Sequence, residues 1–254
     1  MQSDISIVGI KSHIKSNNLP LNIEVLDEAP STNDYLKDVA KTNGTLVVAK
    51  TQTNGKGRRG KTFLSYDGGI YMSLKLGFEN KELLNLLTPS VAVAVSKALD
   101  EILSTETKIK WVNDIYCKGK KLAGILCESL FNKDGTLDSV IIGIGINVLG
   151  YDFTDELRDI AISCYEITGQ KHDRSKIIAN ITNRVFEEIE NLENKEFLAY
   201  YKQKSVLLGK EITVIDSGVT YTATAIDIDD ECRLIVEKNG EVKRLFFGEV
   251  STKI

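Results

Sequence analysis

Alternating and periodic apolar positions divide the chain into a mixed α/β part and a later run of short strands. Residues 69–76 alternate strictly, with Ile70 and Met72 on one face and Tyr71 and Ser73 on the other, a pattern typical of a half-buried strand. Residues 82–103 are apolar around most of the helical circumference and predict a buried core helix with a break near Pro89. Further strands are predicted over residues 21–26, 45–51, 108–111, 122–130 and 139–148, with a helix beginning near Asn33 and turns at 113–114 and 132–135.

The character of the pattern changes after residue 150. Residues 155–168 and 174–205 are predicted to be helical. The segments 211–215, 219–228, 232–238 and 241–247 then read as short strands joined at 216–218 and 239–240 by hairpin turns. These strands predict a small SH3-like barrel. We therefore expect an α+β protein with a short N-terminal segment (1–22), a large domain (23–205) and a C-terminal barrel (206–254).

Composition restricts the class of protein. No apolar run approaches the 18 residues or so of a membrane-spanning helix, and residues 1–20 lack the apolar core of a secretory signal. Four scattered cysteines and two histidines do not have the spacing of a metal site or a disulfide framework. The chain is predicted to be cytoplasmic with free thiols, and its net charge of −4 argues against general nucleic-acid binding.

A glycine-rich basic loop covers residues 51–65. Three glycines alternate with four cations, and no Asp or Glu lies between Val39 and Tyr66, so we expect nothing nearby to neutralise the loop. Glycine lets the backbone approach a ligand, and Lys and Arg bind anions. The loop lacks the spacing of a Walker motif. It therefore predicts a site for an anionic ligand, with a solvated basic turn as the alternative.

Polar residues at strand ends form the second group of candidates. Asn113 offers a donor and an acceptor, Asp114 can orient a cation or hold a metal, and Lys121 directly precedes an apolar strand that would fix its position. Gly124 fits either close ligand approach or simple packing. Asn147 is either a ligand contact or a turn residue. No arrangement of Ser, Cys, His and Asp favours nucleophilic catalysis, so these residues are expected to position and neutralise anions.

Together these motifs resemble those of the biotin protein ligases. The resemblance rests on Ser31-Thr32-Asn33, Gln52–Lys61, Lys110–Asp114, Lys121–Leu126 and Gly145–Val148, in that order and with matching gaps. The late segment Gly248–Ser251 fits the end of the family's C-terminal barrel. The resemblance covers the chain from about residue 22 onward. It implies a catalytic domain with a mixed sheet flanked by helices, like that of class II aminoacyl-tRNA synthetases.

The resemblance also implies a reaction. Biotin and ATP would form biotinyl-5′-AMP and pyrophosphate, and a specific lysine of the biotin carboxyl carrier protein would then displace AMP. Mg²⁺ is expected with the triphosphate, and no metal ligand is assigned on the protein. A glycine-rich loop that closes over the reactive anhydride would keep water away from it.

Site roles follow from the resemblance alone. The implied catalytic residues are Lys121, Arg58 and Asp114. The implied biotin-binding residues are Ser31, Thr32, Asn33, Gln52, Gly55, Lys56, Arg58, Lys121 and Gly124. The implied nucleotide-binding residues are Arg58, Arg59, Lys61, Phe63, Trp111, Asn113 and Asn147.

Three positions depart from the family pattern. Lys56 stands where Arg is usual, Phe63 where Trp is usual and Val112 where Pro is usual. Lys keeps the charge of Arg but not its bidentate fork, and Phe keeps an aromatic wall without an indole donor. These changes concern the affinity for the adenylate more than the reaction itself.

Several questions stay open at this level. A lipoate or octanoate ligase is the nearest alternative, and a non-catalytic nucleotide sensor or DNA-bound repressor is the alternative of another class. The first 20 residues or so predict only a short helix and a loop, so we expect a ligase without repressor activity and without nucleic-acid or membrane partners. A monomer or weak homodimer is expected, in which an exposed strand edge near residues 139–148 could pair with the carrier or a second copy.

Overall fold

The computed structural model describes residues 5–15, 21–38, 42–150, 153–216, 218–246 and 249–251. Its centre is a seven-stranded mixed sheet with the order β1-β2-β3-β7-β6-β5-β4. The strands are β1 (Asn22–Ala29), β2 (Thr45–Gln52), β3 (Ile70–Gly77), β4 (Lys108–Lys110), β5 (Asp114–Cys117), β6 (Lys120–Phe131) and β7 (Leu137–Ile146). Strands β1 and β2 run parallel, and every other neighbouring pair in the sheet is antiparallel.

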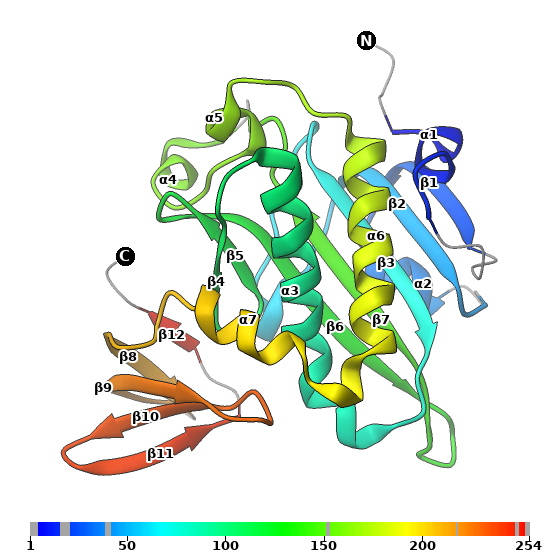
Figure 1. The fold of residues 1–254 in the computed structure, drawn as a ribbon. Helices are drawn as coiled ribbons and strands as arrows, with labels where there is room; N and C mark the ends of the chain where they lie inside the picture. Colours follow the sequence, from blue (N-terminus) through cyan, green and yellow to red (C-terminus); the bar gives the residue numbers. More distant parts are fainter. Residues whose placement is uncertain are drawn as a thin grey trace.

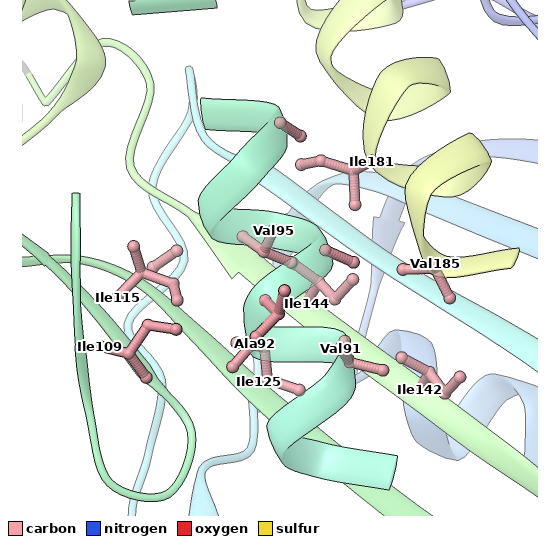
Figure 2. Packing of buried hydrophobic residues seen from close by; sticks show 14 of the residues in the cluster. Val91, Ala92, Val95, Ile109, Ile115, Ile125, Ile142, Ile144, Ile181 and Val185 are labelled. Carbon is pink, nitrogen blue, oxygen red and sulfur yellow. The ribbon is translucent and has the colours of Figure 1, made fainter. Parts of the chain in front are cut away.

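Two long helices cover one face of this sheet (Figure 1). Helix α3 (Leu84–Leu103) lies directly on the strands, and α6 (Arg174–Glu190) packs beside it. In Figure 2, Val91 and Val95 of α3 lie above Ile142 and Ile144 of β7, with Ile181 of α6 alongside. Burying these side chains gives the domain its main core, since each contributes about 1.5–3 kcal/mol. Four of the shorter helices are α1 (Ile7–Lys11), α4 (Asp155–Arg158), α5 (Cys164–Thr168) and α7 (Phe197–Lys204).

The opposite face is covered only in part. Helix α2 (Thr32–Asp38) crosses it, and Leu36 packs on Val47 and Ile141 in a separate small cluster. Ser31 caps this helix, because its Oγ accepts a hydrogen bond from the backbone N–H of Asp34 at 3.4 Å. Alternation places Tyr71 and Ser73 of β3 on this face, with Gly143 and Gly145 of β7 beside them. The face next to α2 is therefore open for a site.

A second sheet follows the last helix. It has the order β11-β10-β9-β8-β12 and is antiparallel throughout. Its strands are β8 (Glu211–Asp216), β9 (Val219–Ile228), β10 (Leu234–Lys238), β11 (Glu241–Leu245) and β12 (Glu249–Ser251). Asn239 and Gly240 both have positive φ (52° and 82°), as the predicted hairpin turn requires. The predicted α+β class with a small C-terminal β domain is confirmed. Ser217, Phe247 and Gly248 lie outside the described residues.

The two predicted helices after residue 150 are both interrupted. Between α4 and α5, Ala161 pairs with Lys121 in an isolated β-bridge. Ser163 and Glu166 then form a capping box, at which α5 begins. The second helix ends at Glu190, where a 3₁₀ turn (Leu192–Asn194) and Lys195 with φ 55° separate it from α7. Apolar spacing alone did not reveal these interruptions, because the short helices bury the same kind of face.

Two further expectations were wrong. Pro89 does not break α3, which runs through it from Leu84 after a 3₁₀ turn (Lys81–Leu83). Burial of the surrounding apolar side chains outweighs the one helical hydrogen bond that proline removes. The segment 139–148 has no exposed edge, because β7 pairs with β3 on one side and β6 on the other. The edges of the large sheet are β1 and β4.

Candidate functional site

A cavity of about 330 Å³ opens on the sheet face that α3 and α6 leave uncovered. Strands β2, β3, β6 and β7, helix α2, the glycine-basic loop and the β4–β5 turn all contribute to its wall. Six basic side chains line it: Lys56, Arg58, Arg59, Lys61, Lys110 and Lys121. Asp114 is the one acidic residue among the described residues of the lining. The chain is acidic as a whole, so this concentration of positive charge marks an anion site.

One end of the cavity is polar but uncharged. Gln52 Oε1 accepts hydrogen bonds from the backbone N–H of Thr32 (2.8 Å) and from its hydroxyl (3.2 Å). The Ser73 hydroxyl lies 2.7 Å from Thr32 Oγ1 and 2.6 Å from Asn33 Oδ1. Such a chain of fixed donors and acceptors suits a neutral polar ligand group.

The glycine-basic loop forms a small hairpin over this region. Phe63 N donates to Gly55 O at 2.9 Å, and Gly57 N donates to Lys61 O at 2.7 Å. Between these two hydrogen bonds, Lys56 and Thr62 form an isolated antiparallel β-bridge. The tip is a 3₁₀ turn at Arg58–Gly60. The loop is therefore a hairpin with its own backbone hydrogen bonds.

Phe63 lies on a floor made of glycines. Gly124 and Gly145 face each other across β6 and β7. A Cβ added at Gly145 would lie 2.6 Å from Phe63 Cε1, and one added at Gly124 would lie 3.3 Å from Phe63 Cε2. The ring also packs edge-on against Tyr71 with the centroids 6.3 Å apart. Gly124 is therefore a glycine at which the side chains of Lys121 and Phe63 pack closely on the backbone, and its contact with a ligand stays a prediction.

Lys121 stands between this floor and the basic end. Its ammonium lies 2.7 Å from Asp114 Oδ1 and 5.8 Å from the centroid of the Phe63 ring. The contact with Asp114 is an ion pair without hydrogen-bond alignment of that oxygen. The Lys121 backbone is fixed on both sides, since its N–H donates to Ile160 O (2.8 Å) and its C=O accepts from Ile162 N (2.9 Å). The scaffold thus holds this cation over the cavity.

Arg58 connects the loop tip to the β4–β5 turn. Its Nη1 donates to Asn113 Oδ1 at 3.3 Å. Asn113 is fixed in turn, because its Nδ2 donates to Ile125 O at 2.9 Å. Arg59 and Lys61 also line the cavity, and both are exposed. The predicted nucleotide-binding cations therefore lie together at one end.

Lys56 contradicts the expectation that nothing neutralises the loop. Its Nζ lies 2.5 Å from Asp34 Oδ2. The partner comes from α2, which follows β1. The parallel pairing of β1 with β2 puts the start of this helix beside the end of β2. A scan of neighbouring sequence positions cannot find such a partner.

Three predicted site residues have structural partners. The Trp111 indole N–H donates to Cys232 O at 2.9 Å and joins the β4–β5 turn to the C-terminal sheet, although the side chain also lines the cavity. Asn147 donates to Lys121 O and Ile162 O, both at 3.3 Å. Gly55 lies within the loop hairpin, where an added Cβ would lie 2.4 Å from Phe63 O. Neither Asn147 nor Gly55 belongs to the described lining of the cavity.

Other lining residues had no predicted role. Tyr71 of β3 lines the cavity, and Ser73 on the same face contacts the lining residues Thr32 and Asn33. The alternation of this strand was the available signal. Burial raises the pKa of Tyr71, so its hydroxyl stays protonated and donates to Tyr66 O at 2.7 Å. Ile215 and Val250 come from the C-terminal sheet, and no local pattern in the sequence could place them at this cavity.

Comparisons with known proteins show the family of this chain. The profile of the Biotin/lipoate A/B protein ligase family matches residues 25–147, and that of the Biotin protein ligase C terminal domain matches residues 207–253. The Bifunctional ligase/repressor BirA of Bacillus subtilis is 34% identical over 252 residues, which are 95% of this chain and 76% of the relative. The chain belongs to the biotin protein ligase family.

Further relatives support the assignment of this chain to the biotin protein ligase family. The Biotin--[acetyl-CoA-carboxylase] ligase of Mycobacterium tuberculosis is 26% identical, with 90% of this chain and 88% of the relative covered. The biotin protein ligase of Aquifex aeolicus, solved with biotin and ATP, superposes with a TM-score of 0.80 at 33% identity, covering 91% of this chain and 97% of that one. Among the described helices of the ligase, none has the length and apolar character that a membrane crossing requires.

Proposed function

We propose that this ligase joins biotin to ATP as biotinyl-5′-AMP and then transfers biotin to a specific lysine of the biotin carboxyl carrier protein of acetyl-CoA carboxylase. One observation carries the proposal. Lys121 stands over the glycine floor, between a polar uncharged pocket and a cluster of cations. A neutral ureido ring with a carboxylate tail fits the first region, and a nucleotide phosphate fits the second. The Aquifex aeolicus relative was solved with both ligands.

In the first step the biotin carboxylate attacks the α-phosphorus of ATP. A new acyl–phosphate bond forms, the bond to the β,γ-phosphates breaks, and pyrophosphate leaves. Two anions must approach each other, so Lys121 is proposed to contact the carboxylate and the α-phosphate while Asp114 orients its ammonium. Ser31, Thr32, Asn33 and Gln52 are proposed to bind the biotin end, with Gly124 as part of the floor.

In the second step the neutral lysine amine of the carrier attacks the acyl carbon. The acyl–phosphate bond breaks, AMP leaves and the amine proton passes to solvent. Arg58, with Asn113 behind it, is proposed to hold the adenylate until the carrier arrives. Arg59 and Lys61 add charge near the phosphates, Trp111 walls the nucleotide end, and Asn147 acts through the Lys121 carbonyl. Phe63 and the loop hairpin exclude water from the anhydride.

Magnesium is proposed to enter with ATP. No group of three or more potential ligand residues occurs among the described residues, but Asp114 and Asn113 offer oxygens at the basic end of the cavity. Mg²⁺ commonly takes one or two protein oxygens and otherwise binds phosphates and water, so this donor set fits it. Bound there, the ion would neutralise the triphosphate and pyrophosphate charge.

The partition into domains at 1–22, 23–205 and 206–254 is also a proposal, supported by the two separate sheets. We further propose a cytoplasmic protein that is a monomer or weak homodimer. The free thiols of its four described cysteines support a reducing compartment. Sedimentation velocity with and without biotinyl-AMP tests the oligomeric state.

The absence of repressor activity stays a prediction, as does the absence of nucleic-acid partners. An operator shift by the purified ligase at moderate salt would contradict both. The choice of biotin over lipoate is tested by pyrophosphate release. Release that depends on biotin and not on lipoate supports the proposal, and the reverse preference would refute it. A carrier domain with its acceptor lysine changed to arginine is the control for transfer.

A further inference from the structure

Lys56 pairs with Asp34 of helix α2, and this contact is not apparent from its place in the basic loop. We propose that Lys56 and Asp34 form a latch that fastens the glycine-basic loop to helix α2. Lys56 is then a positioning residue for the loop rather than the biotin contact that the family resemblance implies. The latch is a contact of the ligand-free protein, and its effect on the release of the adenylate rests on the function proposed above.

The geometry of the loop makes the pair effective. Lys56 lies in the rising strand of the hairpin, bridged to Thr62 and flanked by the hydrogen bonds of Gly55 with Phe63 and of Gly57 with Lys61. Fastening Lys56 therefore fastens both strands of the hairpin. Phe63 is in the returning strand, so the latch also holds its ring on the glycine floor.

The other half of the latch is anchored in the domain. Asp34 lies in the first turn of α2, and Lys37 one turn later lies 3.5 Å from it. Lys37 also lies 2.7 Å from Glu128 of β6, and the same carboxylate accepts a hydrogen bond from Asn33 at 2.7 Å. Burial opposes ionisation of Asp34, but Lys56 and Lys37 outweigh it and lower its pKa. The carboxylate is thus charged and fixed when the loop meets it.

Two cations of one hairpin then have separate tasks. Arg58 at the tip reaches Asn113 on the β4–β5 turn, whereas Lys56 is committed to α2. A lysine suits a single-point latch, since it carries one compact charge and needs no bidentate partner. This accounts for the tolerance of Lys at a position where the family usually has Arg.

The latch and the biotin-contact interpretations predict opposite effects of Asp34→Asn. If Lys56 contacts the biotin part of the adenylate, removing the carboxylate frees its ammonium and strengthens adenylate binding. If the pair is a latch, Asp34→Asn weakens retention as Lys56→Met does, and the double variant is no worse than either single variant. The pair is partly exposed, so each single variant should speed adenylate release by about two- to fivefold.

Amide hydrogen exchange of residues 53–66 in the ligand-free protein is the first measurement. Lys56→Met, Asp34→Asn and the double variant should speed exchange in this segment to the same extent, and the reversed pair Lys56→Glu/Asp34→Lys should restore slow exchange. Lys50→Met is the matched control, because Lys50 pairs with Asp27 at 2.5 Å outside the loop. It should leave exchange in this segment unchanged.

The second measurement is the release rate of biotinyl-AMP in the same variants. Faster release from Asp34→Asn with little change in its pyrophosphate formation supports the latch, and slower release from Asp34→Asn would overturn it. Unchanged loop exchange in all variants would also overturn it. A wild-type protein that forms no biotinyl-AMP would refute the proposed function instead, while the exchange data would still decide whether the latch exists.

Discussion

The ammonium of Lys121 lies 2.7 Å from Asp114 Oδ1, and the two residues stand on neighbouring antiparallel strands. Asp114 is opposite Gly124, and a Cβ there would lie 3.2 Å from Lys121 Nζ. The glycine therefore leaves the space in which the lysine can turn toward the carboxylate. The pair places a charge at the one point of the cavity that both proposed substrates must reach.

Removing the Lys121 charge should stop adenylation. We expect Lys121→Ala to lower pyrophosphate release by at least about 100-fold, as for other preorganised transition-state contacts. Asp114→Asn should have a smaller effect, since it removes the orienting partner and keeps the cation. Lys118→Ala is the control, because Lys118 is exposed and its Nζ contacts Ile167 O. Near-normal release from Lys121→Ala would remove this residue from the site.

Arg58 should control retention more than synthesis. We expect Arg58→Gly to form biotinyl-AMP and to release it, because the variant loses both the cation and its contact with Asn113. Released adenylate acylates exposed lysines, so bystander proteins should become labelled and streptavidin blots measure this directly. Lys133→Gly, on an exposed hairpin tip, is the control. Equal bystander labelling by the wild type and Arg58→Gly would make Arg58 a surface cation only.

The glycine floor predicts a steric effect with a built-in rescue. A Cβ at Gly145 would lie 2.6 Å from Phe63 Cε1 and 2.7 Å from Cζ, so Gly145→Ala must displace the ring. We expect the KM for biotin to rise by about tenfold, which corresponds to about 1.4 kcal/mol. Adding Phe63→Ala removes the clash and should recover part of the affinity. No recovery in steady-state measurements would show that the added methyl acts on something other than Phe63.

How far the sequence determined this picture depends on the kind of contact. Strand alternation in residues 69–76 and the helix start predicted near Asn33 were sufficient for local structure, since both depend on nearby residues. The order of motifs was sufficient for the family. The partner of Lys56 could not be found, because Asp34 reaches it only through the packing of α2 beside β2. Ile215 and Val250 are the extreme case, since their place at the cavity depends on the packing of two sheets.

Trp111 should contribute to stability through the C-terminal sheet. Trp111→Phe removes the donor to Cys232 O and leaves a buried carbonyl without it. We expect a loss of about 1–3 kcal/mol in the free energy of unfolding. Urea denaturation followed by circular dichroism measures it. An unchanged midpoint and slope would mean that the bond to Cys232 adds nothing to the docking of the two sheets.

Buried thiols predict instability at alkaline pH. Burial raises the pKa of Cys164 from about 9 in the unfolded chain to about 12 in the folded protein. The neutral thiol therefore contributes fully below pH 9, and this contribution falls as the pH rises toward 12, by at most about 1.4 kcal/mol per pH unit. Cys164→Ala should lose stability less steeply between pH 9 and 11 in urea titrations. Parallel curves for the two proteins would contradict the shift.

Transfer of biotin to the carrier is the central claim and can be measured in one reaction. The ligase is incubated with MgATP, biotin and a biotin carboxyl carrier domain, and the carrier is then probed with streptavidin. The account predicts that the carrier becomes labelled. The label should be absent when ATP is omitted, when the acceptor lysine is changed to arginine, or when the Lys121→Ala variant replaces the wild type. A carrier that stays unlabelled with the wild-type ligase, while a known biotin ligase labels it under the same conditions, would contradict the account.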